Sequence, residues 1–303
     1  MPDVLSRAGD GRRPERGGFT VAEMLVAMTV LGILALAFTR LLLTQGRFAD
    51  QQNAFRGARS VARQSMNVLV SELRMVQDSG FVDSAATDGK AIRVLVPYWF
   101  GLNCGVISGT QLVSMLPVDS LMVAQAKYYG YAWRAADGSY TKVFPAAPLG
   151  ADAPTTPGST AQCSGTNSGQ ARINVVTIAG RTGQVLQVSP TAAAAPLGEA
   201  IFFFQRVTFA FKASVAFPGN LGLWRLAQGG ADEELVAPFD TTARFKYWTS
   251  GASASVAAPP ALGLIRGVDV VLAGVSAYPP AGKPGPAKAT LVTAIFFKNV
   301  RAF

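Results

Sequence analysis

One acidic residue lies inside the most apolar stretch of the chain, where an ionisable group is energetically unfavourable. Glu23 follows Phe19 by four positions, at the start of an apolar run that extends to Leu43 and is preceded by Gly17 and Gly18. A carboxylate at the centre of a membrane-spanning helix costs about 2.5–3.5 kcal/mol on insertion scales, and less near the helix ends. We therefore expect Glu23 to have a role that offsets this cost, such as pairing with a cation.

Residues for common catalytic and metal chemistry are scarce. The 303-residue chain contains no histidine, which removes Ser-His catalysis, Cys-His catalysis and His-ligated metals together. The acidic segments Asp232–Glu234 and Asp137–Ser139 do not have the spacing of a calcium loop that supplies roughly six to eight oxygens, and we interpret both as turns. The sequence predicts no enzyme, no cofactor and no metal site.

The chain has two cysteines, Cys104 and Cys163. An isolated pair cannot form a four-cysteine zinc site. If this part of the chain lies outside the cytoplasm, a single disulfide that closes a long loop is favoured. The alternative is two separate buried thiols.

The positive charge of the chain is spread thinly. The formal net charge is +9, but residues 1–18 carry four Arg against three acids and residues 19–79 carry six Arg against four acids. This distribution favours a mildly basic solvated surface over a nucleic-acid footprint. Lys127–Tyr129 and Phe245–Trp248 interleave basic and aromatic residues, as a single-strand-binding surface does, but ordinary strand alternation also explains them.

The apolar run from Phe19 to Leu43 is long enough to span a membrane, because about 20 helical residues cross the hydrocarbon core. Residues 1–18 are short and polar, and we interpret them as a leader. A secretory signal peptide would be cut after the run, where Thr44–Gly46 is only a weak site, and a plain signal anchor would not be cut. Neither alternative explains Glu23.

The string RGGFTVAE, residues 16–23, resembles the class III signal of type IV prepilins and pseudopilins. The resemblance implies that a prepilin peptidase cuts between Gly18 and Phe19 and methylates the new amine of Phe19. It implies that Glu23, the fifth mature residue, acts in filament assembly by meeting the N-terminal amine of another subunit. Together with the basic leader, it implies insertion into the inner membrane with a cytoplasmic N-terminus and an exported C-terminal domain.

An amphipathic helix is expected beyond the apolar run, and it would extend to about Gln77. Gly46 and Gly57 lower helix propensity, so two helices with a joint at Gly46 are the alternative. Arg40 stands where major subunits of the family usually have a proline, which favours a minor subunit. The apolar residues that recur at spacings of three and four are Phe55, Ala58, Ala62, Met66, Leu69, Leu73 and Val76.

From about residue 80 the pattern changes to β-branched and aromatic alternation, separated by Gly/Pro-rich loops. The fold class expected is α+β, with a long N-terminal helix packed on an antiparallel β-rich domain as in pilins. We divide the chain into a leader (1–18), a helix (19–79) and an exported domain (80–303). The predicted strands are Ala91–Phe100, Leu121–Arg134, Arg172–Ile178, Val185–Val188, Ile201–Lys212, Gly222–Leu226, Thr242–Trp248, Leu264–Leu272 and Thr290–Lys298. The predicted loops are Pro145–Gly158, Pro190–Gly198, Ser250–Gly263 and Pro279–Pro286.

Six short motifs follow one another in residues 200–300: Val207–Phe211, Leu223–Leu226, Glu234–Val236, Phe245–Tyr247, Ile265–Leu272 and Thr293–Asn299. Their order resembles the larger minor subunits of the family, the J-type pseudopilin of type II secretion and the W-type minor pilin. The resemblance implies a structural subunit that helps to initiate or cap a filament. Its implied partners are other pilin or pseudopilin subunits, the prepilin peptidase, the inner-membrane assembly platform and the membrane. The alternative is a competence-type pseudopilus subunit that binds incoming DNA.

Overall fold

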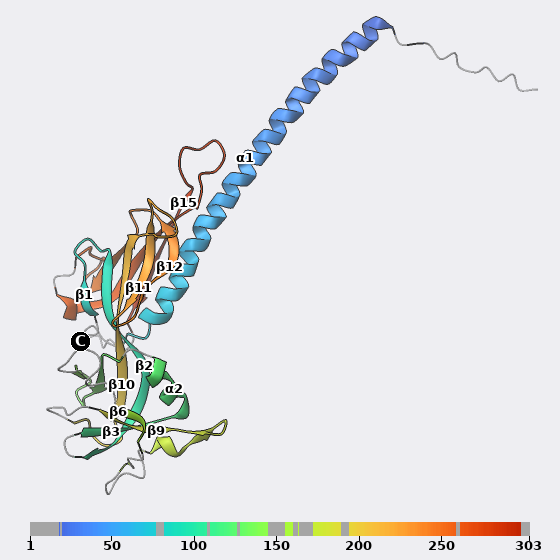
Figure 1. Cartoon of the computed structure of the whole chain (residues 1–303). Coiled ribbons are helices and arrows are strands. Elements are labelled where there is room, and N and C mark those ends of the chain that lie inside the picture. Colours follow the sequence, from blue (N-terminus) through green and yellow to red (C-terminus); the bar gives the residue numbers. More distant parts are fainter. Residues whose placement is uncertain are drawn as a thin grey trace, which may run out of the picture. The chain divides into compact units, whose positions relative to one another are not determined.

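The structure is a computed structural model that describes residues 18, 20–76, 82–107, 110–125, 128–144, 155–159, 163, 172–188, 194–258 and 261–297. The chain divides into two compact units, Met1–Gln51 and Gln52–Phe303. Each unit is described by itself below. The helix α1 (Val21–Leu73), labelled in Figure 1, contributes residues to both units.

In the first unit, α1 is apolar and unburied. It passes through Gly46 without a break, so the alternative of a joint at this glycine is wrong. The mean hydropathy of an 18-residue window reaches 2.3, no part of that window is buried, and the helix is long and apolar enough to cross a membrane. A helix that is apolar on all sides requires lipid or protein around it, so this segment needs a non-aqueous environment.

In the described residues, the second unit is built on one 13-stranded sheet and a separate two-stranded ribbon, and its strand pairs are antiparallel. The main order is β13-β14-β12-β11-β10-β2-β3-β9-β6, while β1 pairs with β2, β15 with β14, and β4 with β10 and β5. The α+β class expected from the sequence is confirmed. The strands are β1 (Val82–Ala85), β2 (Ala91–Ile107), β3 (Thr110–Met115), β4 (Gly130–Arg134), β5 (Tyr140–Val143), β6 (Thr155–Ser159), β7 (Thr177–Ile178), β8 (Arg181–Thr182), β9 (Gln184–Val188), β10 (Ala200–Ala213), β11 (Leu221–Ala227), β12 (Asp232–Phe239), β13 (Arg244–Thr249), β14 (Ile265–Val275) and β15 (Lys288–Phe296).

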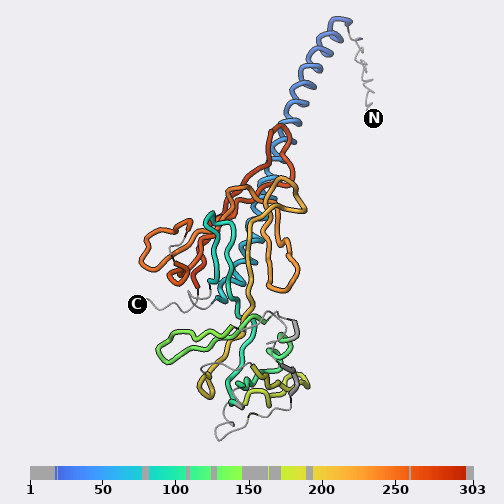
Figure 2. Tube along the Cα trace, turned by 60° about the vertical axis from the view of Figure 1, so that its left-hand side comes forward, coloured from blue at the N-terminus to red at the C-terminus, as the bar shows by residue number. Residues whose placement is uncertain are grey.

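The long strands β2 and β10 connect two parts of this unit and lie side by side in both views (Figures 1 and 2). They pair from Ala91↔Ala210 to Leu102↔Ala200, with one irregularity beside Phe203. One hydrophobic cluster packs around the second half of α1, and another surrounds Trp99 and Phe203. The two strands therefore carry side chains into both cores.

The second half of α1 packs on the sheet through one stripe. The predicted stripe residues Ala58, Ala62, Leu69 and Leu73 are buried, whereas Phe55 lies at its margin and is 37% exposed. The contact is closest at Gly274 on β14, where an added Cβ would lie 2.4 Å from the carbonyl oxygen of Ala58. Small residues on both elements thus allow helix and strand backbones to approach.

Two predicted strands were partly wrong. The first part of Leu121–Arg134 belongs to the helix α2 (Pro117–Gln125), and β4 begins at Gly130. Pro117 occupies the first helical position, where its missing N–H is not needed. Residues Ile173–Val175, expected in a strand, form a 3₁₀ turn, because the Asn174 N–H and side-chain oxygen both bond the Ser114 hydroxyl of β3.

The two acidic segments interpreted as turns have different outcomes. Asp137 is confirmed in a turn, where its carboxylate accepts the Ser139 N–H at 2.9 Å. Asp232–Glu234 instead begins β12 and pairs with β11. Lys212 lies 2.7 Å from Asp232, and the Val215 and Ala216 N–H groups donate to Glu234, so partners distant in sequence override the local turn propensity. The strand β6 also begins inside the predicted loop Pro145–Gly158.

Candidate processing and assembly site

The start of α1 is capped by three reciprocal hydrogen bonds between Thr20 and Glu23. The Thr20 N–H and hydroxyl donate to Glu23 Oε2 at 2.9 and 3.0 Å, and the Glu23 N–H donates to the Thr20 hydroxyl at 3.2 Å. The Thr20 carbonyl accepts the first helical bond, from the Met24 N–H at 3.1 Å. This is a capping box, in which a Thr and a Glu three residues later satisfy two otherwise unpaired N–H groups.

The capping box gives Glu23 a local function that our sequence analysis missed. The signal was available, since the pattern Thr-x-x-Glu before an apolar run predicts such a cap. In the structure the carboxylate has a hydrogen-bonding partner on its own chain, but Thr20 supplies no positive charge. The cap therefore stabilises the helix start without neutralising Glu23.

The predicted cleavage residues, Gly18 and Phe19, directly precede this cap in the sequence. Gly18 is exposed, and an added Cβ at this position would meet no heavy atom within 4 Å. Among the described residues, no neighbouring atom therefore requires glycine at position 18. Phe19 lies outside the described residues, so cleavage there, its methylation and any pairing of its amine with Glu23 stay predictions.

The structure joins Cys104 of β2 to Cys163 in a disulfide, with a Cα–Cα distance of 5.3 Å across a sequence separation of 59 residues. Both cysteines are buried, together with Leu112 and Val185. The alternative of two separate thiols is therefore wrong. A disulfide is typical of proteins that fold in an oxidising compartment.

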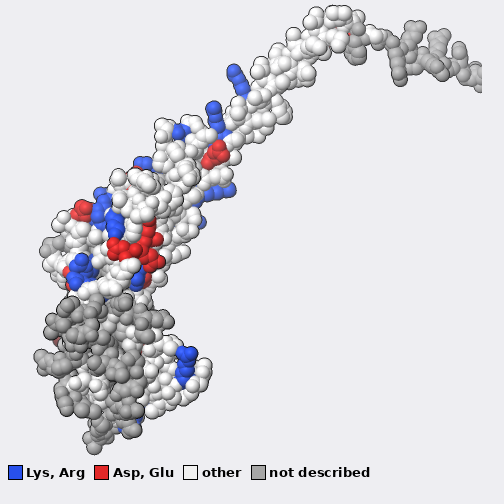
Figure 3. All heavy atoms as spheres, viewed as in Figure 1, with Lys and Arg blue, Asp and Glu red and all other residues white. Residues whose placement is uncertain are grey.

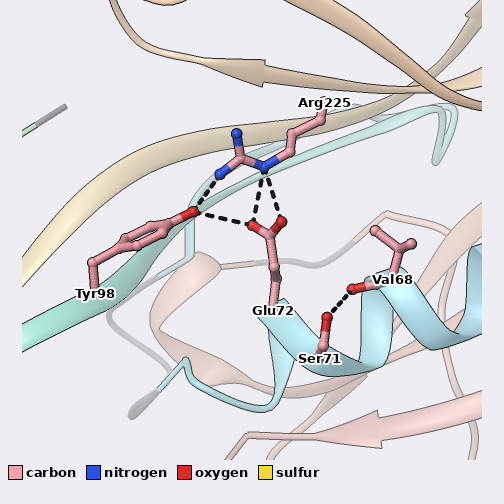
Figure 4. Close-up of polar contacts among 5 residues, drawn as sticks. All are labelled: Val68, Ser71, Glu72, Tyr98 and Arg225. Atoms are coloured by element: carbon pink, nitrogen blue, oxygen red, sulfur yellow. Dashed lines mark hydrogen bonds and ion pairs between the residues drawn. The ribbon is translucent and has the colours of Figure 1, made fainter. Parts of the chain in front are cut away.

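A polar cluster fixes the end of α1 to the sheet (Figure 4). Arg225 Nε on β11 lies 2.9 and 3.2 Å from the two carboxylate oxygens of Glu72, and Arg225 Nη2 donates to the Tyr98 hydroxyl on β2. Burial first, and then the Glu72 charge, raise the pKa of Tyr98. Burial alone would lower the pKa of Arg225, but the Glu72 charge and the neighbouring hydrogen bonds outweigh it and raise that pKa.

A cavity of about 630 Å³ lies beside this cluster. Its walls include Tyr98, Phe100 and Phe202, and its charged lining residues are Arg74 and Asp119. Burial raises the pKa of Asp119, but no second carboxylate lines the described part of the cavity. Across the described residues, no group of three or more Cys, Asp or Glu side chains could hold a metal ion.

The two basic-aromatic segments do not form a stacking surface in the described part of the chain. Phe245 and Tyr247 are fully buried in the core, and the Tyr247 hydroxyl donates to the Ala91 carbonyl oxygen. Tyr128 is also buried, while Lys127 lies outside the described residues. Strand alternation therefore accounts for the pattern in Phe245–Trp248.

The fold and the capped apolar helix define an α+β protein in which one described helix, at the N-terminal end, is long and apolar enough to cross a membrane. Comparison with known families refines this class, because residues 13–39 match the prokaryotic N-terminal methylation motif. The matched segment contains Gly18, Phe19 and Glu23, and the match supports a type IV pilin-like protein with a membrane anchor. No curated protein and no solved structure matches the chain.

Proposed function

We propose that the chain is a minor pilin or pseudopilin, a structural subunit that helps to initiate or cap a type IV pilus or a type II secretion pseudopilus. The observation that carries the proposal is the start of α1. There the methylation motif, an exposed Gly18 and the Thr20–Glu23 cap coincide with the beginning of an unburied apolar helix. Such a helix suits insertion first into lipid and then among the apolar helices of other subunits.

In this proposal the prepilin peptidase removes residues 1–18 and methylates Phe19. Residues 19–43 hold the protein in the inner membrane, with the N-terminus in the cytoplasm and the domain 80–303 exported. The Cys104–Cys163 disulfide supports export, because such bonds persist in oxidising compartments. Other pilin or pseudopilin subunits and the assembly platform are then the partners.

The proposed role of Glu23 in assembly is to receive the N-terminal amine of another subunit. In the isolated chain Glu23 accepts two hydrogen bonds from Thr20 and has no cation beside it in the described residues. A charge buried among apolar helices becomes favourable only with a charged partner. The capped but unneutralised carboxylate would thus make burial of the helix depend on the incoming subunit.

The assignment as a minor subunit rests on two features. Arg40 occurs within α1 where the major subunits of the family usually have a proline, and the helix continues through it. The second unit is also large, with a 13-stranded sheet. The motif order in residues 200–300 favours the J-type or W-type position. The DNA-binding alternative has weaker support, because Phe245 and Tyr247 are buried.

The cleavage proposal is tested by expressing the full chain with its cognate prepilin peptidase and measuring the mass of the mature N-terminal peptide. We expect a chain that begins at Phe19 and carries one added methyl group. A Gly18→Leu variant should remain uncut, whereas Gly46→Ala, a matched glycine change inside α1 with no atom within 4 Å of the new Cβ, should be cut normally. A mature chain that begins at another residue would refute the proposal.

A further inference from the structure

A basic groove separates the second half of α1 from the start of β15, and all of it lies within the unit Gln52–Phe303. Its volume is about 250 Å³. The residues that line it are Phe55, Arg59, Ala62 and Arg63 of α1 and Lys288, Ala289, Thr290 and Leu291 of β15. Three of the eight are basic, and none is acidic.

The groove reaches the edge of the sheet. Four consecutive residues of β15 line the groove. Because successive side chains of a strand point to opposite faces, four in a row can line one groove only if it also borders the strand backbone. β15 pairs with β14 over nine positions without a register shift, and no other described strand pairs with it. Within the described chain, its outer edge is therefore available for hydrogen bonding.

Little in β15 discourages pairing with another chain. Natural edge strands are usually protected by prolines, bulges, shortness or several charges. This strand has nine residues, no proline and a single charged residue, Lys288, at its first position. Val292 and Phe296 are 58% and 57% exposed on its outer face.

The charges of the groove indicate what would bind there. Arg59 and Arg63 lie one turn apart on α1, where like charges destabilise a helix. Neither forms an ion pair with a described residue, and positions 51–71 of the helix include three arginines and no acid. Figure 3 shows such basic side chains spaced along α1. Lys288 differs, because its Nζ lies 2.6 Å from Asp240 Oδ2.

We propose that the free edge of β15 and this groove bind an extended acidic strand of a neighbouring filament subunit. The strand would hydrogen-bond to β15 and place alternate carboxylates against Arg59 and Arg63. The spacing fits, since residues four apart on a helix rise about 6 Å and alternate residues of a strand are separated by about 6.6 Å. Only the identity of the partner as a filament subunit rests on the proposed function.

A second copy of this chain is a poorer occupant, because its own acidic strand is already engaged. In β12, Asp232 pairs with Lys212, and Glu234 accepts the N–H groups of Val215 and Ala216. A different subunit is therefore the proposed source of the acidic strand.

The test uses the full chain in detergent micelles, with a fluorescent peptide as long as β15 in which Glu alternates with Val or Thr. We expect saturable binding by fluorescence anisotropy that weakens as salt is added. A peptide with Lys in place of Glu should not bind, and a peptide with a central proline should bind about tenfold more weakly, because proline cannot complete the ladder. Peptide binding in this test requires neither cleavage nor methylation of the chain. A negative binding result is therefore distinguishable from failure of the proposed function.

Two matched variants locate the site. Arg59→Glu/Arg63→Glu should weaken binding at least about tenfold. Arg56→Glu/Arg74→Glu makes the same change of charge outside the groove, at an exposed position of α1 and at the exposed residue that follows its end, and should have a much smaller effect. Circular dichroism confirms that both variants are folded. If the second variant weakens binding equally, the attraction is nonspecific and the proposal is wrong.

Hydrogen exchange separates edge pairing from simple charge attraction. The Glu peptide should protect amides in Lys288–Phe296 from exchange and should leave the edge strand Tyr140–Val143 unprotected. No peptide binding at low salt, or binding without protection of β15, would overturn the proposal. Protection of β15 that grows with protein concentration in the absence of peptide would show that a second copy is the occupant, which also overturns it.

Discussion

Glu72, near the end of α1, and Arg225 on β11 form an ion pair in which both carboxylate oxygens lie within 3.2 Å of Arg225 Nε. Their side chains are 17% and 19% exposed. The pair joins residues far apart in the sequence, and the Tyr98 hydroxyl of β2 hydrogen-bonds to both side chains. One carboxylate therefore fixes the rotation of the helix end against two strands.

Removing the charge of Glu72 should destabilise the second unit, Gln52–Phe303. In Glu72→Gln, Arg225 keeps its partly buried charge but loses its counterion, so we expect a loss of about 2 kcal/mol in the free energy of unfolding. Urea unfolding of the full chain in detergent, followed by tryptophan fluorescence, measures the change. The control is Glu233→Gln at an exposed position of β12, and an equal loss in this control would contradict the prediction.

The close approach of α1 and β14 should make Gly274 intolerant of any side chain. Gly274→Ala places a Cβ about 2.4 Å from the Ala58 carbonyl oxygen, so helix and strand must move apart. We expect a loss of about 1–3 kcal/mol in the free energy of unfolding. Gly263→Ala is the matched control, because its new Cβ meets no atom within 4 Å. A thermal unfolding midpoint that is unchanged in Gly274→Ala would show that the elements are less tightly packed.

Asp240 should contribute to the acid sensitivity of the domain. Its pKa is lowered to about 2, chiefly by the hydrogen bond from Lys288 and also by bonds from Thr242. Because the folded-state pKa lies below the unfolded value, the stabilisation is complete above about pH 4 and is lost as the pH falls towards 2.

The measurement for Asp240 is stability against pH for the natural chain and for Asp240→Asn. The natural chain should lose about 1 kcal/mol more than the variant between pH 5 and 2, since an ion pair with an exposed lysine is screened by water. Added salt should reduce the difference. An equal loss of stability in the two proteins between pH 5 and 2 would disprove this contribution.

The parts of the fold that the sequence predicted are those with a strong local pattern. The apolar run and the stripe from Ala58 to Leu73 specify a helix and its buried face without reference to the rest of the chain. The alternation in Ala200–Ala213 likewise specifies β10. Such periodicities are local, so a single sequence reveals them.

What the sequence did not predict depends on distant partners. Asn174 turns because Ser114 bonds it, and Asp232 enters a strand because Lys212 and β11 hold it there. The Glu72–Arg225 pair likewise spans a separation of 153 residues that no local pattern reports. At the candidate site, Glu23 was identified from its cost in an apolar run, whereas its bond to Thr20 was overlooked although the spacing is local.

The two roles of Glu23 can be separated by substitution, because a capping box accepts Gln but an amine requires a negative charge. Glu23→Gln should keep the hydrogen bond to Thr20 and normal processing, yet incorporation into filaments should fall about tenfold or more through loss of the ion pair. Thr20→Ala removes the cap, costs about 1 kcal/mol at the helix start and leaves the charge, so assembly should persist. Quantitative immunoblotting of sheared filaments measures incorporation. Glu23→Ala, which loses both the cap and the charge, is measured for comparison. Normal incorporation of Glu23→Gln together with failure of Thr20→Ala would show that Glu23 acts only as a cap.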